Sequence, residues 1–355
     1  MYHTIKYKKA TYYVSMRQYH RNLILTAFLG VFIFLSTGCS QYEALGTTTN
    51  RPHNDGLIIE TSIFPLYDFT RIITSGANAQ VSMLLPPGVD MHGFEPTPAD
   101  IMRLGRSDLL IYIGGHSEVW VNRVSNSMPN LNTIALMHKL GDCEHHHCEH
   151  GEHHCESGHH HCGHVHHHCE HNHNHGHHHN DLDEHIWVSL RNAKAMVQII
   201  ADELSAIDPA NAHIYQENAI AYIAELSTLY AEFHAMRHTA QRDTIIFGDR
   251  FPFVHLANEL NLNFYAAFPG CVHSSEPSIA DMIFLIDTVR TNDIPIVFYV
   301  AMSNGRIANT IAEETNATLL TMHGLHTVPL DDFNNGISYL YLMRHNLEVL
   351  RVALH

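Results

Sequence analysis

The sequence predicts an α/β protein with two lobes, each built on a mostly parallel sheet flanked by helices and joined by one long rigid helix. Short β-rich runs alternate with helical stretches in both halves of the chain, which indicates βαβ units. A long amphipathic stretch separates the two halves. The chain has 355 residues, of which 45% are hydrophobic and 16% charged, so it has enough apolar residues for two cores.

Residues 1–38 have the layout of a lipoprotein signal peptide. Basic residues and no acidic residue precede an apolar run at 23–35, which is too short for a confident membrane span. The segment ends S-T-G-C, which resembles the bacterial lipobox and makes Cys39 the expected acylated residue. Ordinary cleavage or an uncleaved anchor is the alternative. Residues 39–55 are polar and read as a tether, so we expect an extracytoplasmic chain anchored to the lipid bilayer of the cell membrane.

The first lobe is expected at residues 56–141 together with 181–207. Its elements are bounded by turn residues and alternate between β-rich and helical spacing. Strands are predicted at 57–63, 80–85 and 108–114, and helices at 68–75 and 97–105.

A low-complexity insert, residues 142–180, interrupts this lobe. The whole chain carries 35 His, and 19 of them lie between 145 and 179. The insert has almost nothing apolar to bury, so we expect it to be disordered without metal. Thiolate and imidazole suit Zn, Cu or Ni, which predicts a metal-binding loop of low specificity. Its expected ligands are Cys143, His147, Cys148, His154, Cys155, His161, Cys162, His168 and Cys169.

The alternative for the insert is a solvated polar tract that binds metal only incidentally, or cysteines that oxidise among themselves outside the cytosol. The sequence does not decide the redox state of these cysteines or of Cys271.

The linking helix is predicted at 208–240, with Asp208 as its N-cap and Pro209 at its first position. The second lobe follows at 241–355, and its last segment, from Asp331 to the end, closes with an amphipathic helix. The predicted apolar stripe of the linking helix consists of Ile220, Ile223, Leu226, Tyr230, Phe233 and Met236. In the second lobe, strands are predicted at 243–247, 262–268, 294–300 and 318–322, and helices at 278–291 and 304–315.

Charge and motifs exclude several classes of protein. The chain has 20 Lys plus Arg against 36 Asp plus Glu, a formal charge of −16, which argues against nucleic acid as a partner and favours cations. The motifs GxxxxGK[ST], HExxH and a GxGxxG after a strand do not occur, so the commonest signatures of nucleotide hydrolysis, zinc proteolysis and dinucleotide binding are missing.

Three histidines outside the insert are the candidate ligands of a specific site. His92 follows a Pro-Pro-Gly turn at the end of a predicted strand, where open α/β sheets place ligand-binding groups. His185 comes directly after the insert, and His323 ends the predicted strand 318–322.

The strings around these histidines resemble the zinc/manganese-type solute-binding lipoproteins that deliver metal to ABC importers. The matching strings are LPPGVDMHGFEPTPADI, YIGGHSEVW, DEHIWVSLRNA, EPSIADM and YLYLMRHNLEVL, and the similarity covers nearly all of residues 57–355. The resemblance implies a membrane permease as partner and an ion held in the cleft between two lobes. It places the first ligand on His92, the second on His185, and the fourth, usually an Asp, on His323.

The third ligand is where this chain departs from the family. Members have His or Glu just after the first strand of the second lobe, where this chain has Gly248. Asp249, His326 or a water molecule are the alternatives. An imidazole-rich set suits tetrahedral Zn²⁺, whereas Mn²⁺ prefers more oxygen ligands, so Zn²⁺ is the expected ion and Mn²⁺ or another divalent transition metal stays open.

The expected function is therefore capture of Zn²⁺ and its delivery to the permease by a monomeric protein that is not an enzyme. A storage or chelating lipoprotein acting mainly through the insert is one alternative. A zinc-dependent hydrolase is another, with Asp249 or Glu118 as the available general base. The sequence does not decide whether the protein also acts as an adhesin.

Overall fold

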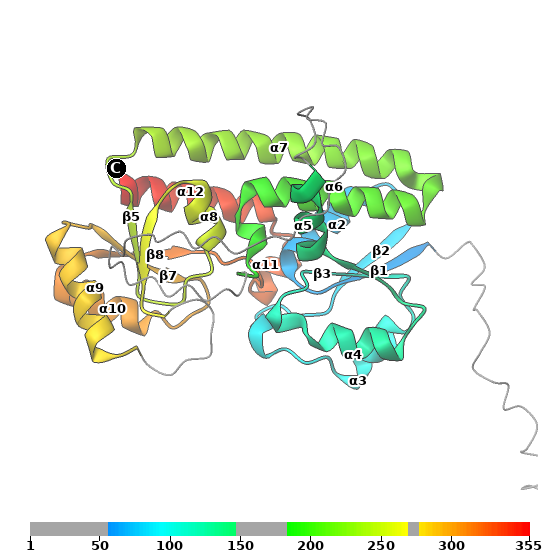
Figure 1. Ribbon diagram of the computed structural model, residues 1–355, viewed down its shortest axis with the longest axis horizontal. Helices are drawn as coiled ribbons and strands as arrows, with labels where there is room; N and C mark the ends of the chain where they lie inside the picture. Colours follow the sequence, from blue (N-terminus) through cyan, green and yellow to red (C-terminus); the bar gives the residue numbers. More distant parts are fainter. Residues whose placement is uncertain (1–55, 147–182, 269–276) are drawn as a thin grey trace, which may run out of the picture. The chain divides into compact units, whose positions relative to one another are not determined.

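The computed structural model describes residues 56–146, 183–268 and 277–355 (Figure 1). The signal peptide with Cys39, the tether, the insert from His147 onward and Cys271 lie outside the described residues. Within the described part, no helix combines the length and the apolar character needed to cross a bilayer.

The first lobe is a parallel four-stranded sheet with the order β2-β1-β3-β4. The three predicted strands are confirmed, and a fourth, β4, was missed because it is short and buries only Ile134 fully. The strands are β1 (Leu57–Thr61), β2 (Ala79–Met83), β3 (Leu109–Tyr112) and β4 (Asn132–Ala135); the helices are α2 (Phe64–Ile73), α3 (Pro98–Leu104), α4 (Trp120–Ser127) and α5 (Leu136–His146). Helix α5 ends within the predicted insert.

The second lobe repeats this plan with the order β6-β5-β7-β8, again all parallel. All four predicted strands are present. They are β5 (Thr244–Phe247), β6 (Asn263–Ala266), β7 (Ile296–Val300) and β8 (Thr318–Met322), with helices α8 (Val254–Glu259), α9 (Ile279–Thr291) and α10 (Arg306–Thr315). The last segment begins with a short helix, α11 (Leu330–Asn334), and closes with the expected amphipathic helix, α12 (Tyr339–Leu354). Gly336 between them has a φ of 73°, which a helix does not allow.

One long helix, α7 (Ala212–Thr239), connects the lobes, and α6 (Leu190–Ile207) of the first lobe packs along it. Helix α7 packs against α6 and α2 of the first lobe and against α12 of the second (Figure 1). Pro209 begins a short 3₁₀ turn and α7 itself starts at Ala212. The side chain of Asp208 accepts hydrogen bonds from Asn211 and from the hydroxyl of Tyr215, which stabilises this turn.

The residues that α7 buries form a seam along the helix, and this seam differs from the predicted apolar stripe. Its buried residues are Tyr215, Ala219, Tyr222, Leu226, Leu229, Phe233 and Met236. They alternate at spacings of four and three residues, the 3.5-residue period of a helix packed along a partner helix. Ile220 falls beside this seam and is 65% exposed, so its prediction as a core residue was wrong.

We expect this seam to decide which substitutions in α7 are tolerated. Ile220→Ala should change the free energy of unfolding by no more than about 0.5 kcal/mol, because the side chain is mostly in water. Leu226→Ala, at a fully buried position, should cost at least about 2 kcal/mol. Urea unfolding of the two variants measures the difference. Equal costs would show that the seam does not carry the packing of this helix.

Candidate metal site

Three imidazoles meet at the carboxyl ends of the parallel strands. His92 lies in a 3₁₀ turn after β2, His185 precedes the 3₁₀ turn Ile186–Val188, and His326 follows β8. The ring centroids of His92 and His185 are 5.5 Å apart, and those of His92 and His326 are 6.1 Å apart. Two imidazoles that share a tetrahedral Zn²⁺ have centroids about 5 Å apart, so a small contraction brings these rings to binding distance.

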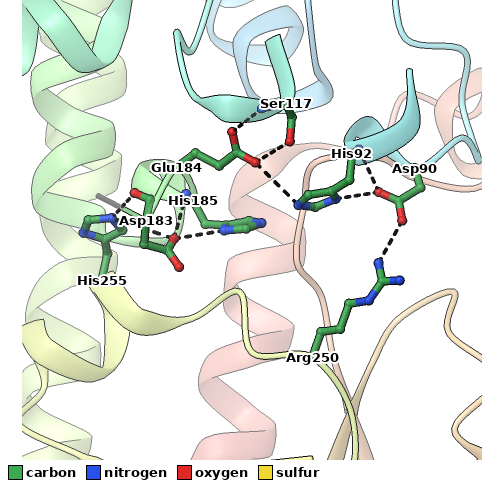
Figure 2. Close-up of polar contacts among 8 residues, drawn as sticks. All are labelled: Asp90, His92, Ser117, Asp183, Glu184, His185, Arg250 and His255. Atoms are coloured by element: carbon green, nitrogen blue, oxygen red, sulfur yellow. Dashed lines mark hydrogen bonds and ion pairs between the residues drawn. The ribbon is translucent and has the colours of Figure 1, made fainter. Parts of the chain in front are cut away.

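A carboxylate two residues upstream orients His92. Oδ1 of Asp90 accepts a hydrogen bond from the backbone nitrogen of His92 at 3.1 Å and lies 2.7 Å from Nδ1 of its ring (Figure 2). The hydrogen bonds from His92 lower the pKa of Asp90 below its usual range. With Nδ1 as the donor, Nε2 carries the lone pair, and this buried Nε2 has no hydrogen-bond partner. Such an unsatisfied acceptor is in the form that a metal ion needs.

His185 is held in the same way. Oδ1 of Asp183 accepts from the backbone nitrogen of His185 at 2.8 Å and lies 2.9 Å from its Nδ1. Burial pushes the pKa of Asp183 up, but the hydrogen bonds and charge of His185 outweigh this and lower it. Nε2 of His255 in the second lobe binds the main-chain oxygen of Asp183 at 2.8 Å, which holds the segment in place. The repeated pattern Asp-x-His therefore orients two imidazoles by one local geometry.

His326 belongs to the second lobe but is held against the first. Its main-chain oxygen accepts from the backbone nitrogen of Phe64 at 3.2 Å, and Nε1 of Trp187 donates to the oxygen of Gly324 at 2.8 Å. Leu325 has a φ of 64°, and this left-handed turn reverses the chain directly before His326. Burial, followed by the proximity of His185, lowers the pKa of His326 to about 3, so its ring is neutral at neutral pH.

His323, the predicted fourth ligand, makes other contacts. Its ring lies 4.9 Å from that of His345, and its backbone nitrogen and oxygen both bond the buried side chain of Asn346. Burial and His345 lower its pKa to about 4. In the described part of the chain no ring contact joins His323 to His92 or His185. The structure thus brings His326, the open alternative, to the predicted pair.

Gly248 and Asp249 lie beside the site, and contacts within the second lobe explain why a glycine and an aspartate are found there. A Cβ at Gly248 would lie 2.5 Å from the backbone nitrogen of Ala308, so α10 leaves no space for a side chain there. Oδ1 of Asp249 accepts from the backbone nitrogen of Arg250, and Oδ2 accepts from Val300 at 3.1 Å and from the hydroxyl of Ser303. The predicted ligand Asp249 therefore joins the segment after β5 to the end of β7.

Glu184 is the site residue that sequence reasoning missed. Its Oε1 lies 3.5 Å from Nε2 of His92, and both side chains are about one-tenth exposed or less. Figure 2 shows its carboxylate between Ser117 and the His92 ring. The available signal was an acidic residue directly before His185.

A cavity of about 520 Å³ opens next to His92 and His326 and is lined by both lobes. Two contacts bridge the lobes here: Nη1 of Arg250 lies 3.1 Å from Oδ2 of Asp90, and the backbone nitrogen of Gly88 donates to the hydroxyl of Thr327 at 2.9 Å. No three His, Cys, Asp or Glu side chains among the described residues already stand at the spacing of a metal-bound set. Binding of one ion by these side chains would therefore require the rings to move closer together.

Buried beside Glu184 lies a carboxyl group with a raised pKa. Burial raises the pKa of Glu118 to about 7, and the charge of Glu184 adds to this. The unfolded chain loses the proton near 4.5, so the folded chain holds more protons between these values, and the contribution to stability falls as pH rises through 7. The difference between the folded and unfolded pKa values corresponds to about 3 kcal/mol of unfolding free energy. Glu118→Gln should remove it, so urea unfolding of the apo variant should show a smaller loss of stability between pH 5 and 8. An unchanged pH dependence would contradict the assignment.

Imidazoles oriented by carboxylates, beside a cavity lined by two parallel-sheet lobes, indicate a two-lobed protein that binds a metal ion. The family model for the "zinc-uptake complex component A periplasmic" matches residues 59–353. This match covers most of the chain, which therefore belongs to that family.

Two relatives and one solved structure illustrate the similarity. The chain is 26% identical over 320 residues to the "high-affinity zinc uptake system protein ZnuA" of Bacillus subtilis, covering 90% of this chain and 94% of that protein. It is 26% identical to the "zinc-binding lipoprotein AdcA" of Streptococcus pneumoniae, with 90% of this chain matched but only 60% of the relative. The crystal structure of the metal-dependent lipoprotein YcdH from Bacillus subtilis shares the fold, with a TM-score of 0.67, 23% identity, and coverage of 84% of this chain and 100% of that one.

Proposed function

We propose that this protein captures Zn²⁺ outside the cytoplasm and delivers it to the membrane permease of an ABC importer. The observation that carries the proposal is the convergence of His92, His185 and His326 at the strand ends between the lobes. Zinc is favoured because neutral imidazoles are borderline ligands of the kind that it prefers. The names of the relatives, a zinc uptake protein and a zinc-binding lipoprotein, support the same ion.

The positioning carboxylates give this proposal a specific test. Asp90→Ala and Asp183→Ala should each weaken Zn²⁺ binding by about 10- to 100-fold, because the imidazole loses the partner that holds its orientation. Competition with a chromophoric chelator measures the affinity. Asp243→Ala is the matched control: its carboxylate accepts from the Thr244 hydroxyl, away from the three histidines in the described contacts. Equal affinity of all three variants would count against carboxylate-oriented imidazoles as the ligands.

The segments outside the described residues have supporting roles in this proposal. Acylation of Cys39 keeps the protein at the cell membrane as a monomer next to its permease. The His/Cys-rich insert collects metal at low specificity close to His185, which it directly precedes in sequence, and the acidic surface raises the local concentration of cations.

Deletion of residues 143–179 separates this proposal from a storage lipoprotein. We expect the deletion variant to keep one tight Zn²⁺ site while it loses the weaker ones, as measured by metal content after dialysis and by titration. If nearly all binding disappears with the insert, the storage role is correct instead.

The hydrolase alternative finds little support in the positions of its two candidate bases. Both oxygens of Asp249 accept hydrogen bonds from its own lobe, and Glu118 is buried, with 4% of the residue exposed. A general base needs a carboxylate oxygen that is available to a water molecule on the metal, whereas Asp249 lines the cavity with both oxygens already accepting hydrogen bonds.

A further inference from the structure

We propose that Glu184 is a ligand of the ion, supplying the carboxylate that completes the three imidazoles. This inference rests on the proposed function and deepens it, because it concerns the ligand set of the same site. In the described part of the chain, the carboxylate of Glu184 lies 3.5 Å from Nε2 of His92, the nitrogen available to a metal ion.

The distance between Glu184 and His92 fits a shared metal better than a hydrogen bond. Oε1 of Glu184 lies 3.5 Å from Nε2 of His92, beyond the ordinary range for such a bond. Ligand atoms at the corners of a Zn²⁺ tetrahedron, with bonds of about 2.0 Å, are about 3.3 Å apart. Nε2 of His92 is buried without a hydrogen-bond partner. The pair therefore already has nearly the separation of two ligands on one ion.

Groups of the first lobe hold the carboxylate of Glu184 in place. The backbone nitrogen of Ser117 donates to Oε2 of Glu184 at 2.9 Å, and the Ser117 hydroxyl donates to Oε1. A Cβ at Gly115 would lie 2.5 Å from the Cβ of Glu184 and closer still to its Oε2, so the glycine makes the space that the side chain fills. Two groups of the segment after β3 thus direct a carboxylate from a distant part of the chain toward His92.

The other carboxylates near the site already accept hydrogen bonds from other groups. Asp90 and Asp183 bind the Nδ1 side of their histidines, which points away from the lone pair at Nε2. Both oxygens of Asp249 accept backbone hydrogen bonds within the second lobe, from Arg250 and Val300. Gly248 has no side chain and no space for one. Glu184 is left as the carboxylate that faces the ligating edge of an imidazole.

Charge supports the same assignment. Imidazoles that bind a metal through a lone pair carry no charge and leave the full double charge on the ion, and the side chains of His92, His185 and Glu184 are one-tenth exposed or less. A carboxylate in direct contact halves this net charge and reduces the cost of removing the ion from solvent.

The test compares Glu184→Gln and Glu184→Ala with the matched variant Glu259→Gln. Glu259 also accepts from a serine hydroxyl, that of Ser189, and from a backbone nitrogen, that of Arg191, but the described contacts place it outside the three-histidine site. Both Glu184 variants should bind Zn²⁺ at least about tenfold more weakly than the unaltered protein and Glu259→Gln, because water replaces a charged ligand. Bound Co²⁺ should show altered visible absorption bands only in the Glu184 variants. Thermal unfolding of the apo proteins checks that each is folded.

The outcomes distinguish this inference from the function on which it rests. If His92→Ala loses tight binding while both Glu184 variants keep the affinity and the Co²⁺ spectrum of the unaltered protein, Glu184 is not a ligand and the function stands. If His92→Ala also binds as tightly as the unaltered protein, the proposed site itself is wrong, and this inference fails with it.

Discussion

Replacing either His92 or His185 with alanine is expected to weaken tight Zn²⁺ binding by at least about 100-fold. A zinc site in a protein binds with about 10–16 kcal/mol, so one of four ligands accounts for about 3 kcal/mol, or a factor of about 100. Both rings are almost fully buried and oriented by carboxylates, so they are organised for binding before the ion arrives. Isothermal titration or chelator competition, performed on the chain without residues 143–179, measures this one site.

His323→Ala is the matched control for this experiment. It removes a histidine of the same lobe as His326, but one whose described contacts are with His345 and Asn346. We expect its Zn²⁺ affinity to stay within about threefold of the parent, whereas His326→Ala should behave like His92→Ala. The reverse result for His323 and His326 would return the assignment to the residue that the family resemblance favours.

Replacing Trp187 with alanine is expected to have the second-largest effect, because this residue joins the lobes behind the site. It is fully buried, its Nε1 donates to Gly324 of the second lobe, and its main-chain oxygen accepts from the hydroxyl of Tyr339 at 2.7 Å. The large cavity should cost about 3–5 kcal/mol of unfolding free energy. Its loss also removes one of the hydrogen bonds that hold the segment around His326 against the first lobe; the others described are donated by the backbone nitrogens of Phe64 and Gly88.

Trp187→Phe separates packing from the hydrogen bond. It keeps most of the ring that packs beside His185 but leaves the buried oxygen of Gly324 without its donor, which should cost about 1–3 kcal/mol. Urea unfolding of the apo variants gives the stabilities, and Zn²⁺ titration gives the effect on the site. A Trp187→Ala protein within about 1 kcal/mol of the parent would show that this contact does not hold the lobes together.

Much of the fold was predictable from local patterns. Strands such as 296–300 and 318–322 are short apolar runs bounded by turn residues, and buried parallel strands have this signature. Strand β4 gave no such signal because its first two residues are exposed polar ones. Ile220 was misjudged because the period of an α7 seam follows its partner helices, which the sequence of α7 alone does not reveal.

The site was predictable in part, for a physical reason. His92 follows a strand end and His185 precedes a helix. The ends of parallel strands and the helices beside them lie close together, which brings these positions near each other. Whether His323 or His326 lies beside His92 depends on the left-handed backbone of one residue, Leu325. Leucine rarely adopts this conformation, so the sequence gives no sign of the turn. The role of Glu184 depends on Gly115 and Ser117, nearly seventy residues away in sequence, so no local pattern contains it.

The continuous apolar core has a consequence for how this protein unfolds. Although the sheets are separate, one cluster of buried side chains extends from Ile59 in β1 through α6 and α7 to Leu354 at the end of α12. Each lobe also has a smaller buried cluster of its own, but both share the largest cluster, so either lobe alone would lack part of its core. We expect a single calorimetric transition for residues 56–355, with no stable half-molecule after cleavage in α7. The cooperative unit of this chain is the pair of lobes together.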